Sequence, residues 1–202
     1  MTMQFQDTLL YNDVVYDTDA ELLEPFLDEK GIRSEHSGSF SANWRGYVAH
    51  FEIKDFEIHL TNHRNSDFFE KVIRELGTTK LIYLNRLVIL YSNLIGHNGW
   101  IQSYNTYENY QVLEIRNGNL TDFKILDHTE FTDFKKSQFL KFIETDDYQK
   151  TKLKRMEQID TENSILREQK GKGPGWHKYK FRENEFLEET EEYILSKTKR
   201  FY

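Results

Sequence analysis

The stretch NWRGYVAHFEIKDFEIHL, residues 43–60, constrains the fold of this chain more than any other part of its sequence. Apolar residues alternate with mostly polar ones from Tyr47 to Lys54, and the alternation resumes at Phe56. A period of two residues is typical of strands with one apolar face. We therefore predict a β-hairpin with a two-residue loop at Lys54-Asp55. A longer turn is also compatible, because Lys-Asp is not a favoured hairpin dipeptide.

That register would place His50 opposite His59 and Glu52 opposite Glu57 on the polar face of the hairpin. Two imidazoles and two carboxylates could bind zinc or another divalent metal, or supply a general acid and a general base. Histidines directly across a ladder are spaced by the sheet, however, and need not converge on an ion. We expect no metal, no cofactor and no catalytic residue, and keep a metal-dependent enzyme using these four residues as an alternative.

Further hairpin signals predict an α+β fold whose antiparallel sheet has about five to eight strands and packs against short helices. Asn12-Asp13 separates two short apolar runs, and Asn117-Gly118 is the strongest turn signal in the chain. A strict two-residue turn at Asn117-Gly118 would put Asp122 on an apolar face, so we expect a bulge at this turn.

Capping residues predict two helices in the first part of the chain. Asp19 can cap a helix that Gly31 ends, and Pro25 within it makes this helix short or places its start near the proline. Ser66 and Gly77 bound a second helix whose apolar residues fall at helical spacing.

The character of the chain changes near Thr132, where a long polar, helix-permissive segment without glycine or proline begins. The glycine-rich loop at Gly171–Gly175 interrupts it, and a final helix follows. We predict an antiparallel α+β domain over residues 1–131 and a helical segment over residues 132–202 that packs on it or extends from it.

Several classes of protein are disfavoured by what the sequence lacks. Without cysteine, a disulfide scaffold, a cysteine nucleophile and a thiolate metal site are impossible. No secretory signal and no long apolar run are present, so we expect a cytoplasmic protein that does not enter a membrane. Nucleophile-elbow, zinc-protease and dinucleotide-binding motifs are also missing, which makes an enzyme the less favoured class.

Charge is distributed unevenly, because residues 1–60 carry 12 acidic and 4 basic side chains. An acidic segment disfavours direct contact with nucleic acid, which requires Lys and Arg. It suits a basic protein partner, such as a basic toxin domain, although solubility alone also explains it. The acidic residues that we expect to steer such a partner are Asp13, Asp17, Asp19 and Glu21.

Trp44 and Arg45 are the candidate anchors of a protein interface, because Trp and Arg dominate the energetics of such surfaces. Gly46 after them can allow a bulge or a close backbone approach. The alternative is structural: Trp44 would close one end of the core and Arg45 would pair with a nearby acid.

The segments LLYNDVVYD, LLEPFLDEKGIR and FSANWRGYVAHFEIKDFEIHL resemble a family of small bacterial proteins of uncharacterised activity with a Trp-Arg-Gly-Tyr strand and a Glu-Ile-Lys-Asp hairpin. YENYQVLEIRNGNLTDFKILD is similar to their later hairpin, so the likeness covers about residues 8–135. Phe51 stands where a Trp is expected. In size, acidity and lack of catalytic motifs these proteins resemble the immunity proteins of bacterial toxin systems. The resemblance implies neutralisation of a cognate toxin by occlusion; a structural or regulatory component of a phage or defence system is an alternative.

Overall fold

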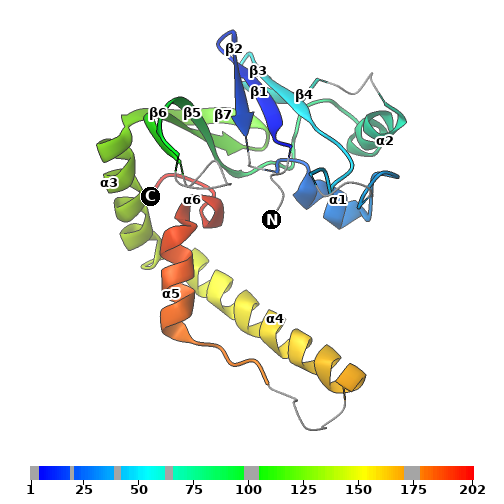
Figure 1. The fold of residues 1–202 in the computed structure, drawn as a ribbon, viewed down its shortest axis with the longest axis vertical. Coiled ribbons are helices and arrows are strands. Elements are labelled where there is room, and N and C mark those ends of the chain that lie inside the picture. Colours follow the sequence, from blue (N-terminus) through cyan, green and yellow to red (C-terminus); the bar gives the residue numbers. More distant parts are fainter. Residues whose placement is uncertain (1–4, 19–20, 39–41, 62–65, 98–104, 171–177) are drawn as a thin grey trace. The chain divides into compact units, whose positions relative to one another are not determined.

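The computed structural model describes residues 5–18, 21–38, 42–61, 66–97, 105–170 and 178–202 (Figure 1). The chain divides into two compact units, the first formed by residues 1–132 with 199–201 and the second by residues 133–198 with 202. The fold is α+β, as the sequence predicts, with a mostly antiparallel sheet in the first unit and a C-terminal helical segment. Of the helices that the structure describes, none is long and apolar enough to cross a membrane.

The first unit is built on a seven-stranded sheet with the strand order β2-β1-β3-β4-β7-β6-β5. Neighbouring strands pair antiparallel except β1 and β3, which are parallel. The strands are β1 (Asp7–Tyr11), β2 (Val14–Thr18), β3 (His50–Lys54), β4 (Glu57–Leu60), β5 (Arg86–Gly96), β6 (Thr106–Arg116) and β7 (Asn119–Asp127).

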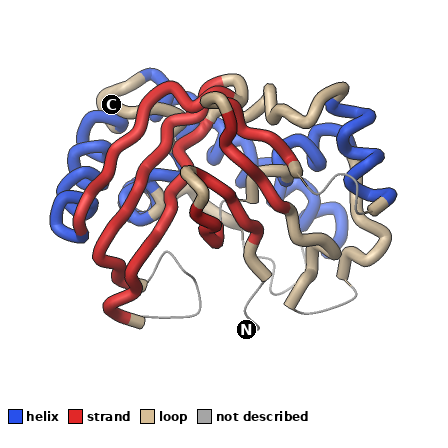
Figure 2. The backbone as a smooth tube through the Cα atoms, turned by 90° about the horizontal axis from the view of Figure 1, so that it is seen from above, coloured by secondary structure: helices blue, strands red, loops and turns tan. Residues whose placement is uncertain are grey.

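The sheet is strongly twisted (Figure 2), and β2 at one end of the strand order contacts β5 at the other. The side-chain amide of Gln111 in β6 donates a hydrogen bond of 2.9 Å to the Tyr16 hydroxyl in β2. These strands lie far apart in the strand order, so the contact requires the coiling that twisted sheets accumulate. The twist turns one face inward, and this face carries the core.

The core of the first unit lies between the inward face of the sheet and two helices, α1 (Glu24–Lys30) and α2 (Asp67–Leu76). The alternation of the strands sends every second side chain into this core, as the period of two predicts. The buried residues include Leu9, Phe51, Ile58, Leu60, Val88, Leu113 and Ile115 from the strands and Phe26, Leu27, Phe69 and Val72 from the helices.

The predicted capping residues of the helices are confirmed at three of four positions. The Ser66 hydroxyl accepts a hydrogen bond from the Phe69 amide at the start of α2, and Gly77 ends this helix with a φ of 75°. Gly31 ends α1 with a φ of 63°. The predicted start near Pro25 is confirmed, because α1 begins at Glu24 with the proline in its first turn, and the residue at the N-cap is Leu23 instead of Asp19.

Two hairpins form at the predicted turns. Asn12-Asp13 joins β1 to β2, and Asn117-Gly118 joins β6 to β7, with positive φ at all four residues. The predicted bulge in the second hairpin is confirmed but lies farther along the strand, since Ile115 pairs with Leu120 whereas Glu114 pairs with Asp122. The extra residue moves Asp122 off the apolar face.

The second unit is helical. Its elements are α4 (Asp146–Lys170), α5 (Glu183–Glu192), α6 (Ile194–Lys197) and most of α3 (His128–Phe142), which begins in the first unit. The Asn163 side chain in α4 makes two hydrogen bonds, of 2.8 and 3.0 Å, to the main chain of Tyr179. The prediction of a single final helix is wrong, because Tyr193 separates two helices, α5 and α6. The predicted loop Gly171–Gly175 lies outside the described residues.

Candidate functional site

The β3–β4 hairpin has a different register from the predicted one. Its loop is Asp55-Phe56, both with positive φ, and Glu52 pairs with His59 instead of Glu57. Phe56 lies at the tip of the turn with 72% of its surface exposed, instead of joining the apolar face. The prediction that His50 faces His59 is therefore wrong. The loop lies one residue later than predicted and includes the apolar Phe56, so every pair in the ladder shifts.

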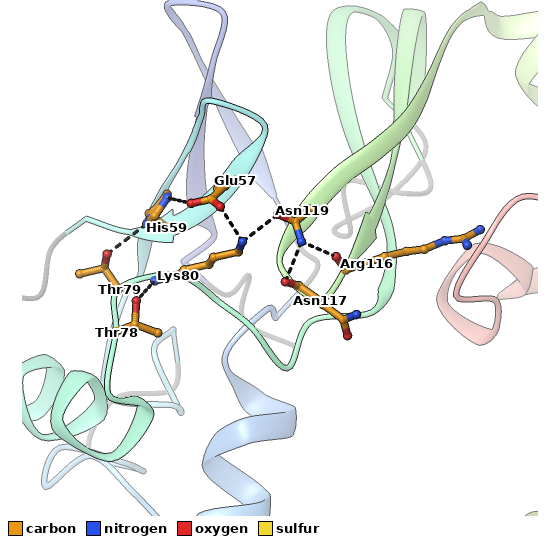
Figure 3. Close-up of polar contacts among 8 residues, drawn as sticks. All are labelled: Glu57, His59, Thr78, Thr79, Lys80, Arg116, Asn117 and Asn119. Carbon is orange, nitrogen blue, oxygen red and sulfur yellow. Dashed lines mark hydrogen bonds and ion pairs between the residues drawn. The ribbon is translucent and has the colours of Figure 1, made fainter.

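The two histidines contact different parts of the first unit. Nδ1 of His50 lies 2.6 Å from the Thr8 hydroxyl on β1. His59 lies between two groups, with Nδ1 3.0 Å from the Thr79 hydroxyl and Nε2 3.3 Å from Glu57 (Figure 3). No group of three or more His, Cys, Asp or Glu in the described part of the chain is arranged to hold a metal ion.

Lys80 links Glu57 to the β6–β7 turn (Figure 3). Its ammonium lies 2.6 Å from Glu57 and donates to the Asn119 side chain at 2.7 Å. The Lys80 hydrogen bond lowers the pKa of Glu57, and the charges of Lys80 and His59 add to the effect. The hydroxyl of Thr79, the imidazole of His59 and the carboxylate of Glu57 contact one another in that order. The same order of groups activates a hydroxyl nucleophile in enzymes. Lys80 engages the same carboxylate, so the contacts of this network join β4 to the 78–80 segment and the turn.

The Trp44 turn, residues 43–46, is the more distinctive surface feature. The Gly46 amide donates to the Asn43 carbonyl at 3.0 Å, and the Trp44 carbonyl accepts from the Gly38 amide at 2.8 Å and the Ser37 hydroxyl at 3.1 Å. Gly46 has a φ of 75°, and a Cβ atom there would lie 2.5 Å from the backbone of His36. Only glycine fits this position, which fixes the turn against the 34–38 segment.

Arg45 holds the Trp44 turn onto β1. Its guanidinium donates to both carboxylate oxygens of Asp7, at 2.9 and 3.1 Å, and to the Phe5 carbonyl at 3.1 Å. The side chains of the pair are 5% and 1% exposed. Burial disfavours the charged guanidinium, but the hydrogen bonds and charge of Asp7 outweigh it and raise the pKa of Arg45. Arg45 therefore has the structural role that the sequence left as the alternative, although it also lines a cleft beside Trp44.

A cleft opens beside Trp44, between the turn and α1. Its lining residues include Trp44, Arg45, Tyr47, Glu24, Asp28, Arg33 and Ser34. The Tyr47 hydroxyl donates to the Glu24 carboxylate. Burial is the main cause that raises the pKa of Tyr47, and the hydrogen bond and charge of Glu24 raise it further. The phenol therefore remains a donor at neutral pH. Glu24 and Tyr47 were not predicted as site residues, because no local signal marks a contact between residues 23 positions apart.

The predicted steering acids occupy more than one place. Asp13 is exposed at the β1–β2 turn, whereas Asp17 is exposed on β2 opposite Thr8. Three residues of β2 lie between the two acids in the sequence. Partial desolvation of its carboxyl group raises the pKa of Glu21, the charge of Arg45 opposes this rise, and the residue as a whole is exposed. Asp19 lies outside the described residues. Of the six predicted interface residues, Trp44, Asp13, Asp17 and Glu21 are exposed on the first unit.

No protein-family model, no curated protein and no solved structure matches this chain.

Proposed function

We propose that this chain is a protein-binding module for a basic partner, and most concretely that it neutralises a cognate toxin by occluding the toxin's active site. The observation that carries the proposal is the exposed Trp44 on a turn that hydrogen bonds hold in one conformation. Trp44 keeps 49% of its surface exposed. A large aromatic side chain on a rigid backbone is a typical hot spot, because little conformational entropy is lost when a partner covers it.

Charge complementarity supports the choice of a basic partner. Residues 1–60 carry 12 acids and 4 bases, and the internal pair of Asp7 and Arg45 takes one of each, which leaves 11 acids and 3 bases. The exposed carboxylates of Asp13, Asp17 and Glu21 belong to the same unit as Trp44. Such a surface attracts a cationic protein at long range and repels acidic ones. The choice of a toxin among basic partners rests on the resemblance of the sequence to immunity proteins.

The test is a pull-down from an extract of the native host with the tagged full chain, the Trp44→Ala variant and the Phe56→Ala variant. Phe56 is a matched control, because it is an exposed aromatic residue of the same unit that does not line the cleft. We expect one stoichiometric basic protein with the parent chain and with Phe56→Ala, and its loss with Trp44→Ala.

The captured protein is then expressed alone and together with the chain. Growth arrest by the partner alone and rescue by co-expression support toxin neutralisation. A partner that does not arrest growth contradicts the immunity function. A partner that the Trp44→Ala variant captures as well as the parent chain does contradicts the assignment of Trp44 to the interface. An acidic partner contradicts the electrostatic argument.

A further inference from the structure

We infer that the cleft beside Trp44 receives an arginine side chain of the partner, with the guanidinium stacked on the Trp44 indole and paired with the Glu24 carboxylate. The inference rests on the proposed function and assigns the chemistry of the partner's central contact. It follows from the charges of the cleft, from the aromatic groups that line it and from the rigidity of its walls.

The charges of the cleft leave one carboxylate uncompensated. Two arginines line the cleft and each is paired, Arg45 with the buried Asp7 and Arg33 with Asp28 at 2.6 Å. Glu24 has no cationic partner among the described residues, and its Oε1 accepts only the neutral Tyr47 hydroxyl. A carboxylate has about four acceptor positions, so one phenol leaves most of its capacity unused. The cleft therefore favours a cation that carries several donors.

The aromatic lining favours guanidinium over ammonium. Guanidinium is planar, stacks on aromatic rings and binds carboxylates through two parallel hydrogen bonds. The protein already uses this arrangement in the same wall, where Cζ of Arg45 lies 4.9 Å from the centre of the Tyr47 ring. Trp44 offers the best aromatic surface for a second cation, because indole binds cations more strongly than phenol does.

The walls of the cleft are fixed before any partner arrives. The Ser34 hydroxyl donates to the Gly46 carbonyl at 2.9 Å, and the Ser37 hydroxyl and the Gly38 amide hold the Trp44 carbonyl. Glu24 lies in the first turn of α1, where Pro25 restricts the backbone. A site with fixed walls loses little entropy on binding, so even an isolated arginine analogue should show measurable affinity.

The test is an NMR titration of the full-length protein with N-acetyl-L-argininamide, in parallel with the uncharged N-acetyl-L-citrullinamide. The reporter is the Trp44 indole N–H signal, which the Trp44→Phe variant identifies. We expect saturable shifts with the arginine probe and at least about tenfold weaker binding of citrulline, because a hydrogen bond to a charged group stabilises a complex by that order. The α-amide of N-acetyl-L-aspartic acid, with its side-chain carboxylate free, serves as the acidic probe and should give no saturable shift.

Glu24→Gln is the decisive variant, because the amide oxygen can still accept the Tyr47 hydrogen bond while the charge is removed. We expect about tenfold weaker binding of the arginine probe. Glu188→Gln on α5, an exposed carboxylate of the second unit, is the matched control and should leave binding unchanged. Should Glu24→Gln fail to fold, Trp44→Ala removes an exposed side chain instead, and the amide signals of Gly38 and Gly46 report binding.

Equal affinity for the citrulline probe, preference for the acidic probe or full retention of binding by Glu24→Gln would overturn the inference. The titration requires no partner, so its outcome is separate from that of the pull-down. If a captured partner binds the Glu24→Gln variant as tightly as it binds the parent chain, the arginine inference is contradicted and the proposed function is not. If the arginine probe binds but the host extract yields no basic partner, the proposed function is contradicted and the arginine site is not.

Discussion

At the scale of single residues, the buried pair of Asp7 and Arg45 is the contact on which the Trp44 turn depends. Asp7 accepts the Arg45 guanidinium and also the Ala49 amide at 2.8 Å. Removing one member of a buried ion pair leaves the other charge without compensation. We expect Asp7→Asn to lower the free energy of unfolding by about 3–5 kcal/mol, measured by urea denaturation.

The exposed pair of Asp28 and Arg33 is the control for this prediction. Its carboxylate and guanidinium lie 2.6 Å apart, but the side chains are 61% and 58% exposed. Solvent screens such a pair, so Asp28→Asn should change the free energy of unfolding by less than about 1 kcal/mol. Equal losses in the two variants would contradict the role assigned to burial.

Glu57 should make the stability of the protein depend on pH. Its pKa is lowered in the folded state, chiefly by the Lys80 hydrogen bond. A lowered pKa contributes stability above the unfolded-state value, and that stability is lost as the pH falls through the folded-state value. The stability difference between the parent chain and Glu57→Gln should therefore be present at pH 7 and shrink below about pH 4.

A double-mutant cycle with Lys80→Met isolates this effect. In the Lys80→Met background, the Glu57→Gln substitution should lose most of its pH dependence, because the main cause of the lowered pKa is absent. Urea denaturation at a series of pH values measures all four proteins. An unchanged pH dependence in that background would contradict the assignment to Lys80.

At the scale of elements, the β3–β4 turn is the least favourable of the three tight hairpins. Asp55 and Phe56 have φ values of 51° and 62°, in a region where a residue other than glycine costs about 1–2 kcal/mol. We expect Phe56→Gly to raise the free energy of unfolding by about 1 kcal/mol, measured by chemical denaturation. Gly118→Ala should have the opposite sign, since its Cβ would lie 2.7 Å from the Leu81 carbonyl oxygen. Destabilisation by Phe56→Gly would show that Phe56 makes contacts that outweigh the strain.

Elements with a local physical signal could be predicted from the sequence. Helix ends could be predicted at Ser66, Gly31 and Gly77, and turns at Asn12-Asp13 and Asn117-Gly118. The physical effect of each of these residues involves only neighbours a few positions away in the chain. The β3–β4 register could not be predicted in the same way. Phe56 continues the apolar alternation, and only the turn conformation shows that this side chain points to solvent.

At the scale of the whole molecule, the chain returns to its sheet at the end. Residues 199–201 belong to the first unit, and the Phe201 amide donates a hydrogen bond of 2.5 Å to the buried Glu114 carboxylate on β6. Phe201→Pro removes this donor. We expect it to lower the free energy of unfolding by about 1–3 kcal/mol more than Phe201→Ala, which keeps the amide, in urea denaturation. Equal effects of the two substitutions would show that the ring of Phe201, and not its amide, is the part that matters.

The uneven charge of the molecule should govern the rate of association with a basic partner. Because exposed carboxylates steer a cation at long range, Asp13→Lys with Asp17→Lys should slow association by about tenfold at low salt and reduce its salt dependence. Glu188→Lys with Glu191→Lys makes the same change of charge on α5 and should slow association less. Surface plasmon resonance at several salt concentrations measures both pairs. Identical kinetics of the two pairs would contradict steering by residues 1–60.

The candidate site could be predicted only in part, because most of its contacts join distant segments. Trp44 stands out in the sequence as an interface residue, and its exposure is compatible with that prediction. The pairing of Arg45 with Asp7 and of Tyr47 with Glu24 arises only when β1, α1 and the Trp44 turn come together. No spacing rule encodes such contacts, so the cleft is visible only in three dimensions.

The Asn117-Gly118 turn is also the place where we expect the chain to deamidate. Asn-Gly is the sequence most prone to deamidation, which starts when the glycine nitrogen attacks the asparagine side chain. In the folded protein the Gly118 amide donates to the Leu84 carbonyl at 3.1 Å, and the Asn85 side chain contacts both the amide nitrogen and the side-chain oxygen of Asn117. The attack requires a rotation that these contacts oppose, so succinimide should form at Asn117 mainly while the hairpin is open. Its slow accumulation would serve as a covalent record of the time that each molecule has spent unfolded.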